Sequence, residues 1–158
     1  MRYTVQHRKS RYISFLVLNL SFGVQFFLIL FVVYKYLMEE LFPEQIKLSI
    51  LGDPDQFLEG KSLLQIVESV HIEVFLIMLT ALTVMSILLR AQIPEKLKIF
   101  FIFTGFISGF VYAVSPFAVS FLGVTFSYVQ FLFFCLFIII CSAVNTLNIY
   151  CFLTGKIK

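Results

Sequence analysis

The pattern of apolar and polar positions divides the chain into four long apolar stretches joined by polar connections. A hydrocarbon core about 30 Å thick is crossed by roughly 20 apolar residues in α-helical conformation. Four stretches reach that length with almost no charge inside them: residues 12–36, 70–89, 99–119 and 126–153. We therefore predict four transmembrane helices and one sizeable extramembrane segment, residues 38–69.

The connections between the last three predicted spans are short. Short connections place consecutive helices side by side and antiparallel. The predicted fold is an all-α integral membrane protein, an up-and-down bundle of four transmembrane helices that forms a single membrane domain over residues 1–158. Pro116 lacks a backbone N–H, so we expect it to end or kink the third span.

The extramembrane segment contains turn signals and one helix start. Pro43 and the sequence Gly52-Asp53-Pro54-Asp55 are typical of breaks and tight turns. Ser62, followed three residues later by Gln65, has the spacing of a capping box. We expect a helix to begin there and to continue into the second span, with its first turns above the membrane.

Composition excludes a water-soluble protein. Of the 158 residues, 60% are apolar and 13% are charged, which is too little polar surface to cover a soluble core. The first apolar stretch follows a basic start, as in a secretory signal, but it is about twice the length of a cleavable apolar region. We interpret it as a membrane anchor.

Charged residues predict how the chain is threaded, because Lys and Arg near span ends are retained in the cytoplasm. Most of the basic residues lie before span one, between spans two and three, or at the end of the chain: Arg2, Arg8, Lys9, Arg11, Arg90, Lys96, Lys98, Lys156 and Lys158. Every acidic residue except Glu95 lies in or next to the extramembrane segment. We expect both termini to face the cytoplasm, and the net charge of +3 then gives no reason to expect a nucleic-acid partner.

Three ionisable residues near the start of span two form the candidate metal site. Glu68 and His71 are three residues apart and so lie on one helix face, and Glu73 follows inside the span. The Glu-x-x-His spacing occurs in carboxylate-bridged metal sites, which need further ligands from other helices. A solvated, hydrogen-bonded pair is the alternative for Glu68 and His71. An ionisable residue inside a span usually faces protein or water, which makes Glu73 the foremost functional candidate.

Histidine and cysteine positions limit the cofactors. His7 and His71 are expected on opposite sides of the membrane, so they cannot together hold one haem within a subunit. We expect no cofactor, although a metal or haem at an interface between subunits stays open. Cys135, Cys141 and Cys151 all lie in span four without a metal-site or C-x-x-C spacing, so we expect them to be packing residues.

Small and amide side chains mark expected helix contacts inside the membrane. Gly105, Gly109 and Ala113 repeat every four residues along span three, and such a stripe allows two helices to approach closely. The stripe serves either a neighbouring helix of the bundle or another subunit. Asn19, Asn145 and Asn148 could form hydrogen bonds between helices, or line a transport path.

Short motifs give the chain a resemblance to small bacterial inner-membrane proteins with four helices. These motifs are Gln6-His7-Arg8-Lys9, Lys61-Ser62, Glu68-x-x-His71 and Glu95-Lys96-Leu97-Lys98, and the likeness covers most of the chain. The related proteins carry a second histidine two positions after the first, where this chain has Glu73. The resemblance implies a respiratory or envelope setting and no particular activity.

Three hypotheses for function follow. The first is a non-catalytic accessory or assembly subunit of a larger inner-membrane complex, because catalytic motifs and soluble domains are not evident in the sequence. The second is a redox, metal- or haem-associated membrane protein that uses Glu68, His71 and Glu73. The third is a small oligomeric channel or carrier. Expected partners are the lipid bilayer and either other membrane subunits or further copies of this chain.

Overall fold

A computed structural model describes residues 11–53 and 57–154, with side chains from Phe15 onward. Six basic or histidine residues of the predicted pattern lie outside the described residues: Arg2, His7, Arg8, Lys9, Lys156 and Lys158. The four predicted spans are confirmed as long helices, and the protein is an all-α membrane protein. They are α1 (Arg11–Leu37), α3 (Leu63–Arg90), α4 (Glu95–Leu122) and α5 (Thr125–Leu153).

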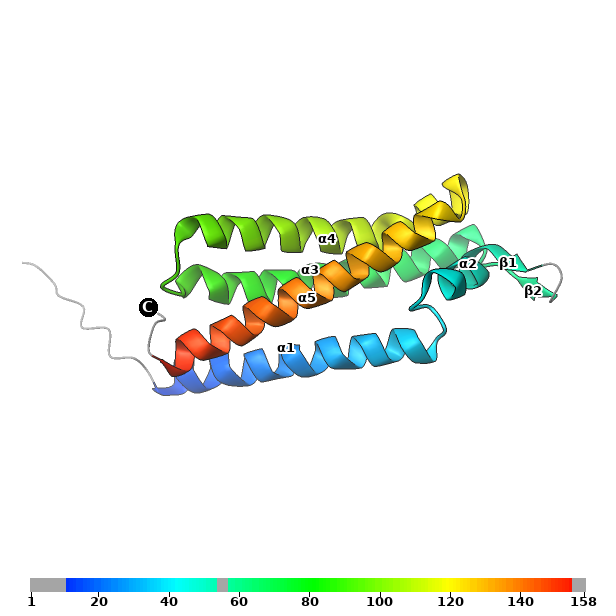
Figure 1. The fold of residues 1–158 in the computed structure, drawn as a ribbon. Coiled ribbons are helices and arrows are strands. Elements are labelled where there is room, and N and C mark those ends of the chain that lie inside the picture. Colours follow the sequence, from blue (N-terminus) through cyan, green and yellow to red (C-terminus); the bar gives the residue numbers. More distant parts are fainter. Residues whose placement is uncertain (1–10, 54–56, 155–158) are drawn as a thin grey trace, which may run out of the picture.

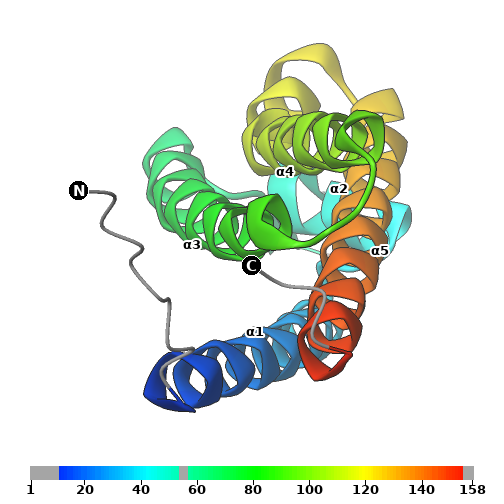
Figure 2. The same ribbon diagram turned by 90° about the vertical axis from the view of Figure 1, so that its left-hand side faces the viewer.

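The four long helices form an elongated bundle in which α5 crosses the others obliquely (Figure 1). It packs most extensively on α4, and α4 in turn packs on α3. Helix α1 contacts α5 and has few contacts with α3, so it lies at one side of the bundle (Figure 2). The first residues of α1 and the last residues of α5 lie at the same end of the molecule (Figure 1).

The opposite end is covered by a short helix and a hairpin, and we call it the α2 end. Helix α2 (Pro43–Leu51) is followed by strands β1 (Gly52–Asp53) and β2 (Leu58–Glu59), which pair antiparallel. Pro43 occupies the start of α2, where a missing N–H is tolerated. Ile46 and Ile50, one turn apart, pack with Ile66, Val70 and Val119 of the long helices. This apolar contact fixes α2 to the bundle.

The predicted capping box at the start of α3 is confirmed. The backbone N–H of Gln65 donates to the Ser62 hydroxyl at 3.4 Å, and the backbone N–H of Ser62 donates to the Gln65 side chain at 2.8 Å. At 28 residues, α3 is about 42 Å long at 1.5 Å per residue. It is therefore longer than the hydrocarbon core is thick.

Of the two outcomes expected at Pro116, an end or a kink of the third span, the end is not observed, because α4 continues to Leu122. Proline cannot donate to the carbonyl oxygen four residues earlier, which belongs to Tyr112. The hydroxyl of Ser115 donates to that oxygen instead, at 2.5 Å. A side-chain donor thus replaces the lost backbone bond, as is common in membrane helices.

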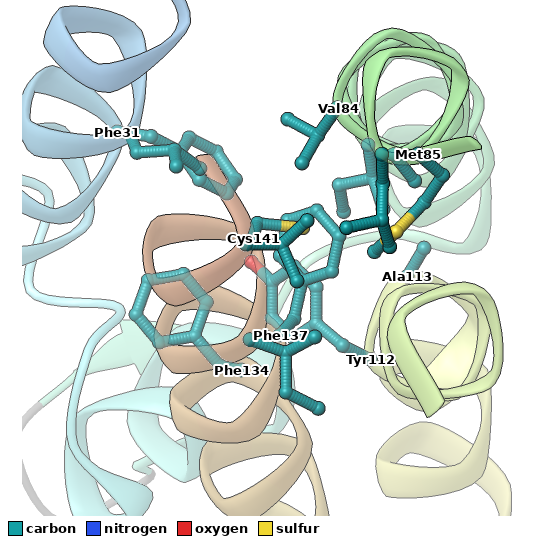
Figure 3. Close-up of a cluster of buried hydrophobic side chains, with 14 residues drawn as sticks. Phe31, Val84, Met85, Tyr112, Ala113, Phe134, Phe137 and Cys141 are labelled. Carbon is teal, nitrogen blue, oxygen red and sulfur yellow. The ribbon is translucent and has the colours of Figure 1, made fainter. Parts of the chain in front are cut away.

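The centre of the bundle is filled by aromatic and aliphatic side chains (Figure 3). Phe31 of α1 contacts Tyr112 of α4 and Phe134 of α5, with ring centroids 6.4 and 5.7 Å apart. Tyr112 and Phe134 also pack against each other at 5.1 Å. Phe137 and Cys141 of α5 are fully buried in the same cluster. This apolar layer lies between the polar groups of the α2 end and those nearer the chain termini.

Candidate functional site

Four charged side chains pair with one another at the α2 end, and we call them the ion-pair cluster: Lys35, Glu40, Lys61 and Glu73. Lys35, in the last turn of α1, donates to Oε2 of Glu40 at 2.8 Å and to Oε1 of Glu73 at 2.5 Å. The Lys35 side chain is only 4% exposed and that of Glu73 13%. Charges so far removed from water are stable only when they are paired, so these groups depend on one another.

The turn after α1 brings Glu40 back over Lys35. The backbone N–H of Glu40 donates to the carbonyl of Lys35 at 3.0 Å, and that of Glu39 donates to the carbonyl of Tyr36 at 3.2 Å. Glu39 itself adopts a left-handed conformation, with φ of 54°. This is the bonding pattern of a Schellman motif, which reverses the chain at a helix end. The local turn therefore places the Glu40 carboxylate beside the Lys35 ammonium group.

Glu40 connects α1, α2 and the segment before α3 through its two oxygen atoms. The ammonium group of Lys61 and the hydroxyl of Ser49, at 3.2 Å, both donate to Oε1, while Lys35 donates to Oε2. Burial alone would raise the pKa of Glu40, but the attraction of Lys35 and the hydrogen bonds from both lysines lower it from 4.5 to about 2. Glu40 is therefore ionised throughout the neutral pH range.

A cavity of about 20 Å³ adjoins the ion-pair cluster. That volume accommodates one group of the size of a water molecule. Its lining includes Ser69, Pro116 and Gln130 as well as the four charged residues. Gln130 is 4% exposed, and its Oε1 has no hydrogen-bond partner among the described residues. Oε2 of Glu73 is likewise buried.

Tyr112 extends the polar region toward the centre of the bundle. Its hydroxyl lies beside the Glu73 carboxylate and interacts with it. Oε1 of Gln130 thus remains the buried, unpaired polar atom beside the cavity among the described residues. Buried polar atoms are usually paired, so unpaired ones close to a cavity mark a candidate binding site.

The structure does not bring the expected metal ligands together. Glu68 and His71 are exposed on the outer face of α3, whereas Glu73 is turned inward and is bonded to Lys35. At about 100° per residue, Glu73 lies roughly 140° around the helix from Glu68. Among the described residues no three histidine, cysteine, aspartate or glutamate side chains are grouped as metal ligands would be. The structure therefore does not place Glu68, His71 and Glu73 at one metal site, as the sequence had led us to expect.

Two of the three expected asparagines connect helices. The side-chain amide of Asn145 donates to the carbonyl of Ser21 at 2.8 Å and to Oε1 of Gln25 at 3.2 Å, which ties α5 to α1. Asn148 donates to the carbonyl of Val84 at 2.9 Å, which ties α5 to α3. Asn19 does not act this way: it is exposed, and it donates to the carbonyl of Phe15 in its own helix at 2.9 Å.

The stripe of Gly105, Gly109 and Ala113 is buried within the bundle. A methyl group added at Gly105 would come within 2.5 Å of Met85, and one added at Gly109 within 2.6 Å of Ile77. Met85 and Ile77 belong to α3, so these glycines are what allows α3 and α4 to approach closely. Of the two uses left open by the sequence, the structure places the stripe against a neighbouring helix of the same chain.

An apolar groove of about 810 Å³ lies between α1 and α3. We call it the α1–α3 groove; its lining comprises Phe15, Leu16, Asn19, Leu20, Gly23, Val24, Phe27, Leu76, Leu79, Thr80 and Thr83. The two threonine hydroxyls donate to carbonyls of their own helix and leave the groove wall apolar. Its shape follows from the arrangement of the helices, since α1 packs mainly on α5 and only weakly on α3.

Sequence reasoning found Glu73 but missed its partners. Lys35 was available as a signal, because it is a charged residue at the end of an apolar stretch. The up-and-down order puts the end of span one and the start of span two at the same end of the bundle. A buried lysine and a buried glutamate there could therefore have been matched by topology. Nothing in the local sequence indicates that Gln130, far along the chain, would join them.

Comparison with known proteins agrees with the description of a helical membrane protein. Residues 40–157 match a family of transmembrane helical domains, a match that includes α2 to α5 and leaves out α1. No curated protein and no solved structure matches the chain. Because the family match extends over most of the chain, the protein belongs to the Aq_1264_TM family of transmembrane helical domains.

Proposed function

We propose that the protein is a non-catalytic accessory or assembly subunit of a larger complex in a bacterial inner membrane. In this proposal the α1–α3 groove receives a transmembrane helix of a partner protein. The observation that carries the proposal is the groove itself, a concave surface of about 810 Å³ along two membrane-spanning helices. A packed helix bundle ordinarily leaves few large hollows, because side chains of neighbouring helices interdigitate.

Two groove residues favour a helix over a lipid chain as the occupant. At Gly23 an added methyl group would have no atom within 4 Å, so another helix could approach the α1 backbone there. Asn19 uses its amide N–H within α1, and its oxygen has no partner among the described residues. A partner helix can offer this oxygen a hydrogen-bond donor, whereas an acyl chain cannot.

The packing of the centre supports a role other than transport through a single chain. Along α1, Phe31 lies between Gln25 and Lys35. Along α5, the buried side chains of Phe134 and Phe137 lie between Gln130 and Asn145, so apolar side chains separate the ion-pair cluster from the amide groups of the other half. A path for ions or polar solutes needs a continuous polar lining. The described residues of one chain offer polar groups on either side of these phenylalanines, whose side chains are apolar.

The distribution of charge supports an orientation in which the α2 end faces away from the cytoplasm. Arg90, Lys96 and Lys98 lie around the α3–α4 connection, at the end of the bundle where α1 begins. The acidic residues of the described extramembrane segment lie at the α2 end. Basic residues are retained on the cytoplasmic side, so the ion-pair cluster is proposed to lie toward the outer face.

Site-specific photo-crosslinking in the native membrane tests the proposal. A photoreactive side chain replaces Leu79 in the groove or, as a control, Ile139, which is similarly exposed on α5. We expect one polypeptide to be crosslinked in near-stoichiometric yield from position 79 and not from position 139. Gly23→Leu should abolish that crosslink without disturbing the fold, because the space beside Gly23 is open.

Other outcomes overturn the proposal. Equal crosslinking from both positions would mean nonspecific contact with neighbouring proteins. Crosslinking to lipid alone would make the groove a lipid-facing surface. A crosslink between two copies of this chain, with a homo-oligomer after mild extraction, would favour the small channel or carrier instead.

A further inference from the structure

The ion-pair cluster is contributed by two separate parts of the chain. Of the residues that line the cavity at the α2 end, all except Lys35 fall within residues 40–157, which match the family. Lys35 belongs to α1, outside that match. Its ammonium group reaches into a pocket that the other elements form. Lys35 can therefore be regarded as an occupant of the pocket.

The pocket around the Lys35 ammonium group is rich in hydrogen-bond acceptors. Oε2 of Glu40 and Oε1 of Glu73 accept from Lys35 at 2.8 and 2.5 Å. Oε1 of Gln130 is a buried acceptor without a partner among the described residues. Gln130 is 96% buried and lines the cavity, so this acceptor belongs to the site and not to the surface.

Charge and size indicate what such a pocket binds. Without Lys35, the charges of Glu40, Glu73 and Lys61 sum to −1, which suits a single positive charge. An ammonium group has three donors and no acceptor, and it is compact. A guanidinium group is a larger planar fork, and Ca²⁺ prefers six to eight oxygen ligands. The small cavity and the few acceptors favour the ammonium group.

We infer that residues 40–157 form a binding pocket for a primary ammonium group, and that the side chain of Lys35 occupies this pocket in the described conformation. The same chemistry is offered by free alkylamines and by amine-bearing lipid headgroups. An amine from either source fits where the Lys35 side chain is removed. This inference does not depend on the proposed partner helix, because the pocket and the groove involve different surfaces.

Chemical rescue of Lys35→Ala tests the inference. The purified full-length variant is unfolded thermally in detergent with n-propylammonium chloride or, at equal concentration, tetramethylammonium chloride, which has no N–H donor. We expect propylammonium to raise the melting temperature of the variant in a saturable manner, with a midpoint on the order of 1 mM, typical of a weak single-group ligand. Neither salt should produce a saturable rise in the unsubstituted protein, where Lys35 fills the pocket.

Two further variants define the specificity. The double variant Lys35→Ala/Glu73→Gln also lacks one charged acceptor of the pocket. In this variant propylammonium should no longer raise the melting temperature. Lys47→Ala, on α2 and without an ion pair among the described residues, should show no saturable rise. Equal effects of the two salts on Lys35→Ala, or rescue that survives Glu73→Gln, would overturn the inference.

Poor folding of Lys35→Ala would not prevent the test. The same salts are then present during extraction, and the monodisperse fraction is measured by size-exclusion chromatography. A higher fraction with propylammonium than with tetramethylammonium supports the inference, and equal fractions contradict it. Nanodiscs of phosphatidylethanolamine or of phosphatidylcholine distinguish the sources, because a lipid amine would stabilise the variant only in the former.

Discussion

Replacing Lys35 by methionine is the most direct test of how the α2 end is held together. Methionine keeps much of the length and apolar character of the lysine stem and removes the ammonium group. Glu40 would retain Lys61 as a partner, whereas Glu73 would lose its ion-pair partner among the described residues. The Glu73 side chain is 13% exposed, so water can compensate only in part. The substitution therefore leaves one largely buried carboxylate without a counter-charge.

The expected loss can be estimated from this geometry. Removing one partner of a buried ion pair typically destabilises a protein by about 3–5 kcal/mol. The Glu73 side chain is partly exposed, and Glu40 keeps its contact with Lys61. We therefore expect the loss in the free energy of unfolding to lie at the lower end of this range, about 3 kcal/mol. That is a large fraction of the ~5–15 kcal/mol by which proteins are stable. Lys35→Met/Glu73→Gln should recover part of the loss, because an amide carries no charge that needs compensation.

The free energy of unfolding is measured by denaturant titration in mixed micelles at neutral pH. The proteins compared are the single variants Lys35→Met and Glu73→Gln and the double variant Lys35→Met/Glu73→Gln. Lys47→Met is the matched control, since Lys47 forms no ion pair among the described residues, and its effect should stay within about 0.5 kcal/mol. The double-mutant cycle should give a coupling of about 1–3 kcal/mol. A loss for Lys35→Met no larger than that of the control, or strictly additive effects, would refute the reasoning.

Three further predictions concern other parts of the structure. Gly109→Ala should destabilise the purified protein by about 1–3 kcal/mol, because the added methyl group overlaps Ile77, whereas Gly23→Ala, with open space around it, should change the unfolding free energy by less than about 0.5 kcal/mol. Asn145→Leu should cost about 1 kcal/mol and increase hydrogen–deuterium exchange in α1, because it removes the amide bonds to that helix; unchanged exchange would contradict this role. The pKa of Glu40 is lowered to about 2, so its stabilising contribution is complete above about pH 5 and is lost as the pH falls from about 4.5 to 2. Unfolding free energies of the unsubstituted protein and of Glu40→Gln should therefore differ by on the order of 2 kcal/mol at pH 7 and converge near pH 2, and a constant difference would be evidence against the ion pairing.

Several features could be predicted from local sequence because their causes are local. Hydropathy over about 20 residues is sufficient to identify a membrane-spanning helix, and all four predicted spans are helical. The capping box at Ser62 and Gln65 depends on side chains three residues apart, and it forms as expected. Helix α2 was not foreseen, because nine residues with two buried isoleucines give too short a pattern to identify.

Local sequence and tertiary structure differ most clearly at Pro116 and at Glu73. Local reasoning expected a helix to end or kink at Pro116. The helix continues past this residue, and the hydroxyl of Ser115 supplies a donor to the carbonyl that proline leaves free. For Glu73, proximity in sequence suggested a metal site shared with Glu68 and His71. The actual partner, Lys35, is 38 positions away on another helix.

The sequence by itself determined that the chain has four helices long and apolar enough to cross a membrane, and that Ser62 and Gln65 open the second of them. These properties depend on the transfer of each segment into lipid and on hydrogen bonds within one turn, so neighbouring residues suffice to decide them. Only the tertiary structure decided which side chains meet, such as Lys35 with Glu73 or Asn145 with Gln25. Such pairs depend on how each helix is rotated about its axis and on which helix it packs against. Those rotations are set jointly by all the packed side chains, and no single segment of the sequence contains them.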